Sequence, residues 1–285
     1  MHRRRFLAAV GAAAIPAFVP VGARAVSPDG TFMVDSRVLG DRRRVNIALP
    51  PGYAGSKRRF PVLYLLDGGT VQEDFPKITD FVSQMVAAGV LAPMIVVGIE
   101  GVDRKHDLTH PATFAKDREL LPTSGGSAAY RRFLVDELRP WVRARYRVDG
   151  RSGLIGESLA GLFVVETFLR EPQAFDAYLA ASPSLWWDDQ SLSRQALTLL
   201  GRGGFKGRRL YLSIGDEGTT MQEGVDRVVV ALRTAPPKGL LWRYAPMPNE
   251  HHATIYDPSA KAGLPWLFPP PLTRLSRAPA NILRK

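Results

Sequence analysis

Short apolar runs alternate with amphipathic segments along the chain from about residue 60 onward. The runs show little alternation between apolar and polar positions, which is typical of strands buried on both faces of a parallel sheet. They lie at residues 61–66, 94–99, 151–156, 178–181, 210–214 and 241–244. Segments with a helical pattern separate or follow them, at residues 76–88, 128–146, 159–169, 221–233 and 257–267. This alternation predicts an α/β fold with a mostly parallel central sheet and helices on both faces.

Three further features complete this plan. Residues 32–39 and 44–49 are predicted to be two strands joined by a turn at Gly40-Asp41. A long loop is expected over residues 100–126. Pro140 is expected to kink or divide the helix at 128–146, because proline lacks the backbone N–H and clashes with the preceding turn. Ligands of such sheets bind beyond the carboxyl ends of the strands, so the residues just after each run are the candidates for chemistry.

The first 25 residues have the form of an export signal. Arg3-Arg4-Arg5-Phe6-Leu7 is a basic head of the twin-arginine type, an uncharged apolar run follows, and Ala23-Arg24-Ala25 gives a small-x-small cleavage pattern. The alternative is an uncleaved anchor, but prolines interrupt the run, and a span needs about 20 apolar residues. We therefore expect a signal peptide over 1–25, a single domain over 26–285, a periplasmic or secreted protein, and no stable membrane insertion after cleavage.

The composition limits the kinds of molecule that the protein is expected to bind. The chain of 285 residues has no cysteine, so an exported form would have no disulfides, which fits a route that carries already folded proteins. The formal charge is +11, and removing the four arginines of the first 25 residues, which hold no acids, leaves +7. The basic residues lie in scattered short groups without interleaved aromatics, so nucleic-acid binding is not expected. The pattern makes no prediction of oligomeric state.

The segment Gly156-Glu157-Ser158-Leu159-Ala160-Gly161 lies between a predicted buried strand and a helix. This is the setting of a nucleophile elbow, a tight turn in which small residues flank an exposed serine. Ala160 stands where the strict G-x-S-x-G pattern has glycine, a difference of one methyl group. The alternative is an ordinary Gly/Ser turn. The elbow interpretation makes Ser158 the nucleophile and the backbone N–H of Leu159 a donor to the oxyanion.

A serine hydroxyl needs a base, and the base needs a carboxylate that fixes its tautomer. His251 and His252 follow the last predicted strand, where the chain order Ser, acid, His places the base, whereas His106 and His110 precede the elbow. Asp216 and Glu217 follow the strand at 210–214, with Glu223 as a more distant acid. A second oxyanion donor is expected in the Gly68-Gly69 turn, where glycine lets the backbone approach closely.

These residues resemble the putative esterase family, which includes esterase D, the enterobactin esterases, feruloyl esterases and the mycolyltransferases. The resemblance covers roughly residues 32–268. It rests on an ordered set of motifs: L-Y-L-L-D-G at 63–68, F-L-V-D-E-L-R-P at 133–140, I-G-E-S-L-A-G-L at 155–162, S-P-S-L-W-W at 182–187, G-D-E at 215–217 and E-H-H-A-T-I at 250–255. The resemblance implies an α/β-hydrolase fold.

The resemblance also implies roles for particular residues. In the family a small residue and then Ser or Thr follow the base, which favours His252 over His251, and the residue after D-G is the second oxyanion donor, which is Gly69. Spacing favours Glu217 as the acid and keeps Asp216 as the alternative. The family uses no metal and no organic cofactor. Arg118 resembles a family position near the site and is a candidate for binding an anionic substrate group. Apart from the resemblance, Trp186 and Trp187 follow a predicted strand and are candidates for the wall of the acyl or alcohol pocket, with the buried core as their alternative place.

The leading functional hypothesis is hydrolysis of a small-molecule carboxylic ester through an acyl-serine intermediate. Cleavage of a siderophore trilactone in the periplasm is a close alternative that the resemblance and export both permit. Acyl transfer to a sugar or lipid hydroxyl is a second, which differs in whether the site excludes water. The alternative from another class is a catalytically inactive envelope protein that binds ligands in the same cleft.

Overall fold

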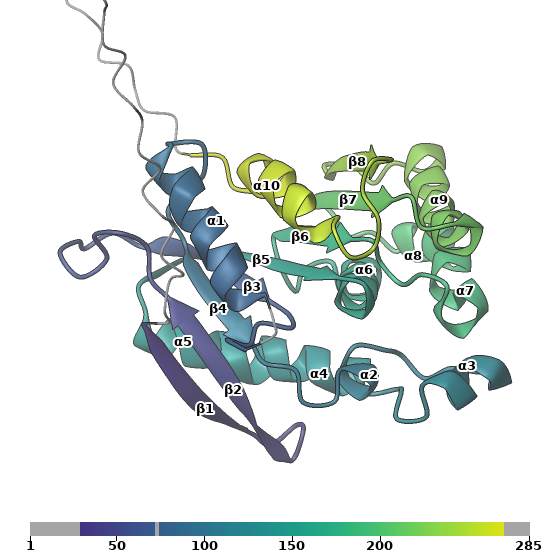
Figure 1. Cartoon of the computed structure of the whole chain (residues 1–285), viewed down its shortest axis with the longest axis horizontal. Helices are drawn as coiled ribbons and strands as arrows, with labels where there is room; N and C mark the ends of the chain where they lie inside the picture. Colours follow the sequence, from purple (N-terminus) through teal and green to yellow (C-terminus); the bar gives the residue numbers. More distant parts are fainter. Residues whose placement is uncertain (1–28, 72–73, 271–285) are drawn as a thin grey trace, which may run out of the picture.

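The computed structural model describes residues 29–71 and 74–270. Eight strands form one sheet in the order β1-β2-β4-β3-β5-β6-β7-β8 (Figure 1). The strands are β1 Gly30–Ser36, β2 Asp41–Ala48, β3 Phe60–Leu65, β4 Ile95–Ile99, β5 Val148–Glu157, β6 Ala177–Ala181, β7 Arg209–Gly215 and β8 Leu241–Met247. β2 pairs antiparallel with β1 and with β4, and every other neighbouring pair is parallel. The predicted α/β-hydrolase fold with a mostly parallel sheet is confirmed.

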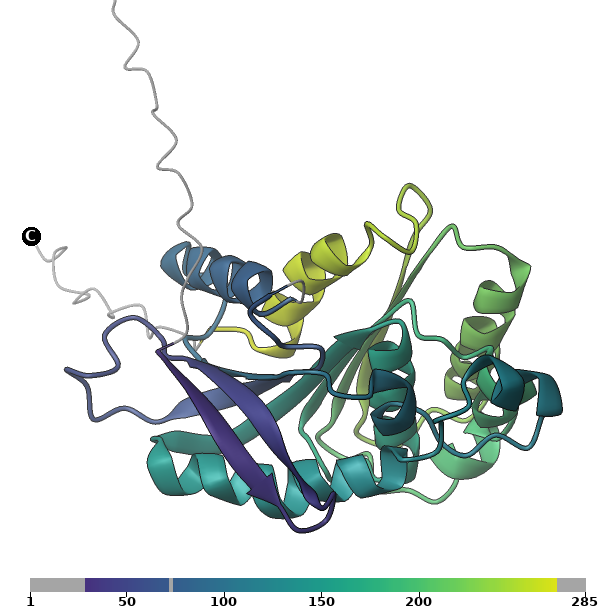
Figure 2. The same cartoon turned by 60° about the horizontal axis from the view of Figure 1, so that its bottom comes forward.

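Helices cover both faces of the sheet (Figures 1 and 2). One face carries α1 Phe75–Ala87 and α10 Tyr256–Leu267, which contact each other. The opposite face carries α4 Ser127–Arg132, η1 Phe133–Leu138, α5 Arg139–Arg145, α6 Leu159–Arg170, α8 Ala196–Leu200 and α9 Thr219–Thr234. In β3, Tyr64 packs with the second group of helices and Leu65 with the first, as the period of two along a strand requires.

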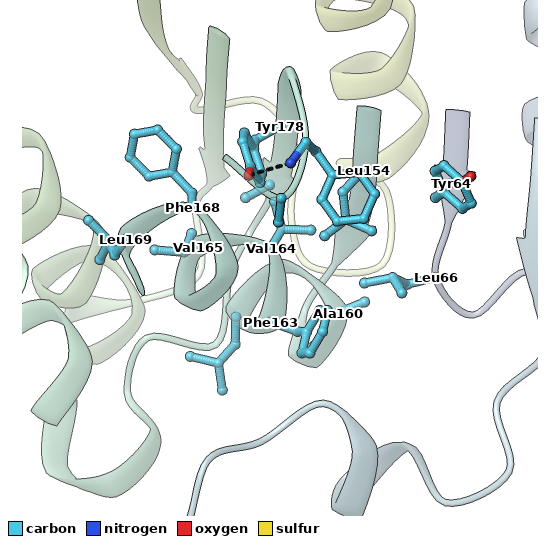
Figure 3. Close-up of a cluster of buried hydrophobic side chains, with 14 of the residues drawn as sticks. Tyr64, Leu66, Leu154, Ala160, Phe163, Val164, Val165, Phe168, Leu169 and Tyr178 are labelled. Carbon is cyan, nitrogen blue, oxygen red and sulfur yellow. Dashed lines mark hydrogen bonds between the residues drawn. The ribbon is translucent and has the colours of Figure 1, made fainter. Parts of the chain in front are cut away.

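The helix α6 lies at the centre of the core. Every residue from Leu159 to Leu169 is buried, which explains why apolar residues are not confined to one stripe of this segment. The buried charge of Glu166 is paired with Arg131 and Arg170. Figure 3 shows Phe163 and Phe168 of α6 with Tyr178 of β6 among the buried side chains that surround it. Burying one such side chain contributes about 1.5–3 kcal/mol, so the helix that follows Ser158 is anchored firmly.

The predicted helix at 128–146 is continuous but changes its winding. The segment η1 is a π-helix, with wider turns than an α-helix, and it leads directly into α5, where Pro140 lies in the first turn. A proline ring in a regular α-helix clashes with the carbonyl four residues earlier, here that of Asp136. The wider turn relieves this clash, and the winding changes from π to α at Arg139, next to Pro140, so the predicted irregularity at this proline is a change of winding between η1 and α5.

The predicted loop at 100–126 contains two short helices, α2 Arg104–Asp107 and α3 Ala115–Leu120, and α7 Trp187–Arg194 packs near α3. Asp188 of α7 accepts hydrogen bonds from the backbone N–H groups of Thr113 and Phe114 at 2.6 and 2.9 Å. Trp187 Nε1 donates to the carbonyl of His110 at 2.9 Å. Buried contacts therefore hold the loop against the body of the fold.

The expected signal peptide at 1–25 lies outside the described residues. None of the helices within 29–71 and 74–270 combines the length and the apolar character that crossing a bilayer requires.

Candidate active site

The chain turns sharply at Ser158, between β5 and α6. Ser158 has a φ of 62°, a left-handed conformation that costs a non-glycine residue about 1–3 kcal/mol. Its backbone N–H donates to the carbonyl of Ala181 at 3.1 Å, which ties the turn to β6. A Cβ on Gly156 would lie 2.6 Å from the Cβ of Ala160, so the missing side chain of Gly156 leaves room for the methyl group of Ala160. Leu159 begins α6, where the N–H groups of the first turn have no partner within the helix.

A hydrogen-bonded series runs from Ser158 through His252 to Glu217. His252 Nε2 lies 2.9 Å from Ser158 Oγ, and His252 Nδ1 lies 2.5 Å from Glu217 Oε2. Nδ1–H donates to the carboxylate, which leaves Nε2 to accept from the serine hydroxyl. The three residues follow β5, β8 and β7, so they meet at the carboxyl edge of the sheet. The structure thus brings together the residues predicted as nucleophile, base and acid.

Glu217 is the acid that reaches the imidazole. Its side chain is only 4% exposed, and the hydroxyl of Ser182 donates to its other oxygen, Oε1. Both carboxylate oxygens are therefore held. The side chain of Asp216 is exposed, and Glu223 on α9 accepts a hydrogen bond from Gln190 at 3.2 Å. Asp216 and Glu223 lie outside the series.

The other described histidines take no part in this series. His251 lines the same cleft as His252. His106 Nδ1 lies 2.7 Å from the carbonyl oxygen of Thr123. His110 is buried with Nε2 3.2 Å from Ser191 Oγ, and burial lowers its pKa. Within the part of the chain that the structure describes, no group of three or more His, Cys, Asp or Glu side chains could hold a metal ion.

The backbone that leads from β3 to Gly69 is fixed by close packing. A Cβ on Gly68 would lie 2.4 Å from the Cα of Gly98 in β4, so only glycine fits there. The N–H of Gly68 donates to the carbonyl of Ile99 at 2.8 Å, and its own carbonyl accepts from Asn46 Nδ2 at 3.0 Å. A backbone fixed in this way can present an N–H group without rearranging during a reaction.

An open cleft of about 680 Å³ gives access to Ser158 and His252. Its apolar wall is formed by Leu120 and Leu121 at the end of α3, Trp186 at the start of α7 and Met221 of α9. Arg104 of α2 adds a guanidinium group. The apolar wall of such a cleft suits a ligand with an apolar or aromatic body.

Two residues implied near the substrate lie elsewhere. Trp187 is completely buried, whereas its neighbour Trp186 is partly exposed and lines the cleft, because adjacent side chains at the start of α7 point in different directions. Arg118 is exposed on α3 and is not among the cleft residues. The guanidinium in the cleft belongs to Arg104, which pairs with Asp67 at 2.8 Å.

Comparison with known proteins shows which family this arrangement belongs to. The Esterase family model, described as "Putative esterase", matches residues 36–258, which include Ser158, Glu217 and His252. The chain belongs to this esterase family.

Several relatives of this esterase are named for siderophores. It is 34% identical over 155 residues to the ferri-bacillibactin esterase BesA of Bacillus subtilis, a match covering 49% of this chain and 51% of that one. It is 28% identical over 224 residues to the apo-salmochelin esterase of Escherichia coli, covering 72% and 68%. Among solved structures it is similar to an IroE-like serine hydrolase from Shewanella oneidensis, with a TM-score of 0.78 and 26% identity over 84% of this chain and 79% of that one. The match to BesA spans about half the length of that relative.

The esterase site also holds residues that the sequence analysis did not single out. Ser182, within the motif at 182–187, orients Glu217. Asn46 is a polar residue in an otherwise apolar stretch of β2, and it holds the loop before Gly69. Arg104 was one of many charges in a long loop. The sequence could have indicated Ser182 and Asn46, because each is a polar residue just after or inside a buried strand. No sequence feature distinguished Arg104.

Glu157, between Gly156 and Ser158, gives the esterase site a second carboxylate. Its Oε1 lies 3.4 Å from His252 Nε2. Burial raises the pKa of Glu157 to about 7, and the negative charges of Asp74 and Glu217 act in the same direction. Beside the cleft lies a second cavity of about 540 Å³, lined by Asp67, Asp74, Lys77, Gly101, Val102, Arg104 and Glu157.

Proposed function

We propose that the protein is an exported serine carboxylic-ester hydrolase in which Ser158 is the nucleophile, His252 the base and Glu217 the acid. The observation that carries the proposal is the hydrogen-bonded series of these three side chains at the carboxyl edge of the sheet. Membership of the esterase family supports the same reaction class.

The proposed mechanism has two stages, acylation of the serine and hydrolysis of the acyl-serine. Ser158 Oγ attacks the carbonyl carbon of the ester while its proton passes to His252 Nε2, and the N–H groups of Gly69 and Leu159 donate to the oxyanion. The alcohol leaves with that proton, which gives an acyl-serine. Water then attacks the acyl carbon, His252 takes a proton from it, and Ser158 recovers its hydroxyl as the acid is released. Glu217 keeps the ring in the productive tautomer throughout.

The cleft indicates the class of substrate. The side chain of Trp186 and the leucines of α3 offer an apolar wall, and Arg104 offers one cation beside it. The names of the relatives make a siderophore lactone the specific candidate. An ester of an aromatic acid is the broader candidate.

The test measures hydrolysis of p-nitrophenyl acetate and butyrate by the purified protein, with Ser158→Ala and His252→Ala as matched variants. Turnover by the wild type, and a fall of several orders of magnitude in both variants, is the expected result. A wild type no faster than Ser158→Ala would favour the inactive binding protein. Product esters formed with an added sugar or glycerol, in place of free acid, would favour acyl transfer.

Export is part of the same proposal. The signal features at 1–25 and the absence of cysteine support it. Replacing Arg3 and Arg4 by lysine should hold the precursor in the cytoplasm of a host that has the twin-arginine route, as measured by cell fractionation. Unchanged export would contradict the twin-arginine assignment.

A further inference from the structure

Glu157 contacts the imidazole of His252 from the side that faces the nucleophile. The distance from Glu157 Oε1 to His252 Nε2 is 3.4 Å, while Ser158 Oγ lies 2.9 Å from the same nitrogen. The side chain of Glu157 is 21% exposed, and its Oε1 is buried and makes no hydrogen bond within the described residues. A buried carboxylate oxygen without a donor is costly, so a role in the fold does not explain it.

The charge on Nε2 changes during the proposed reaction. Since Nδ1–H donates to Glu217, Nε2 carries a lone pair in the resting state and a proton only after it has taken one from Ser158. A carboxylate beside Nε2 therefore gains attraction only when the imidazolium forms. Interactions that strengthen only in the transition state accelerate the chemical step rather than binding.

Resting on the proposed function, we propose that Glu157 is a positioning residue for His252: its carboxylate stabilises the imidazolium beside Ser158, and its protonation withdraws Nε2 from the serine. The protonated acid has an O–H that can donate to the Nε2 lone pair, in competition with the hydroxyl of Ser158. No atom is exchanged with the substrate in this step, and the proton on Glu157 comes from solvent.

The surroundings of Glu157 set where this change occurs. The charged and titratable groups around it are His252, Glu217 after β7, Asp74 before α1, Arg104 on α2 and Tyr256 on α10, with Asp67 and Lys77 farther along the same cavity. Burial, aided by the two carboxylates, raises the pKa of Glu157 to about 7, while His252 and Arg104 oppose the shift. Glu157 is then a carboxylate well above pH 7 and a neutral acid well below it.

The experiment records kcat and KM for p-nitrophenyl butyrate from pH 5 to 10 in the full-length protein, in Glu157→Gln and in Asp74→Asn. Glutamine keeps the shape of the side chain and mimics the neutral acid. At pH 8.5 we expect kcat of Glu157→Gln to fall about ten- to thirtyfold with KM within twofold. The acid limb of log kcat/KM should be steeper than a slope of one in the wild type, because protonation of Glu157 adds to the loss of rate, and should have a slope of one in the variant.

Asp74→Asn removes a negative neighbour of Glu157 without touching His252. Its acid limb should move to lower pH while the rate on the plateau stays within twofold. Thermal unfolding separates this role from a structural one: an ionised carboxylate with a raised pKa destabilises the fold above that pKa. Glu157→Gln should therefore raise the melting temperature at pH 8.5 and leave it unchanged at pH 4.

A Glu157→Gln protein with wild-type kcat and an unchanged acid limb would overturn the proposal. If that variant did not fold, a wild-type slope of one, or an Asp74→Asn profile superimposable on the wild type, would overturn it as well. Failure of the proposed function looks different, because the wild type and Ser158→Ala would then be equally slow at every pH.

Discussion

Replacing Glu217 by glutamine changes one charge and leaves the shape of the side chain, and the structure dictates how the new side chain sits. The hydroxyl of Ser182 donates to Oε1 of Glu217, so in the variant the amide oxygen takes that place. The NH2 group then faces His252 Nδ1, which must accept instead of donate. The ring proton moves to Nε2, and the base loses the lone pair that faces Ser158.

The size of the effect follows from this tautomer change. We expect kcat/KM for p-nitrophenyl butyrate to fall about 10³- to 10⁴-fold, which corresponds to about 4–5.5 kcal/mol of lost transition-state stabilisation. Asp216→Asn is the matched control, because it makes the same charge change on the neighbouring exposed side chain. Its kcat/KM should stay within threefold of the wild type.

Ser182→Ala sharpens the test. Alone, it removes a hydrogen bond to a buried carboxylate, worth about 1.5–3 kcal/mol, so kcat/KM should fall ten- to a hundredfold. Combined with Glu217→Gln, it frees the amide to rotate and present its oxygen to Nδ1. The double variant should be about tenfold more active than Glu217→Gln alone. Losses that multiply in the double variant, or an equal loss in Asp216→Asn, would refute the reasoning.

Three further predictions follow from the packing. Gly68→Ala should displace the loop before the predicted oxyanion donor, because the new Cβ would lie 2.4 Å from Gly98 Cα. We expect kcat to fall at least a hundredfold and the free energy of unfolding, measured in urea, to fall by about 1–3 kcal/mol. An unchanged kcat would contradict the role of this loop. Asp188→Ala should destabilise the fold by about 2–3 kcal/mol because it leaves the backbone N–H of Thr113 without its partner, and a loss under 0.5 kcal/mol in the same assay would show that the loop is held by other contacts. Trp186→Ala should raise KM about tenfold for an aromatic acyl ester and less than threefold for p-nitrophenyl acetate. The reason is that the aromatic contact contributes about 1 kcal/mol beyond its buried area. Equal increases in KM for both esters would show that the acyl group does not contact Trp186.

The sequence predicted the parts of this protein that local patterns determine. Buried parallel strands are uninterrupted apolar runs, so β3, β4 and β7 were found to within about a residue. The elbow and the position of His252 followed from chain order along the sheet. The helices α7 and α8 were missed because their hydrophobic pattern is short, and three residues of α7 have positive φ, which no propensity suggests.

The pattern of apolar and polar residues could not predict the direction in which side chains point in loops. Trp186 and Trp187 are identical in type and adjacent, but Trp187 is the one that turns inward, where it packs in the core and donates a hydrogen bond to the carbonyl of His110. In the same way, Glu217 differs from Asp216 through a contact with Ser182, which lies 35 residues away in the chain. Tertiary contacts of this kind decide which of two similar neighbouring residues takes a given role.

Backbone strain in the described part of the chain is concentrated around the site. The non-glycine residues with positive φ are Asp67, Ser158, Ser182 and the run 188–190. The first three follow β3, β5 and β6, which are neighbours in the sheet, and the run anchors the long loop beside the cleft. Each such residue costs about 1–3 kcal/mol, so the arrangement persists only because the buried strands and α6 hold it. The apolar runs that predict the sheet therefore also hold two strained residues in place. These are Ser158, the proposed nucleophile, and Ser182, which donates a hydrogen bond to Glu217. A substitution that loosened α6, such as Phe163→Ala, should lower activity at temperatures where the fold is still intact.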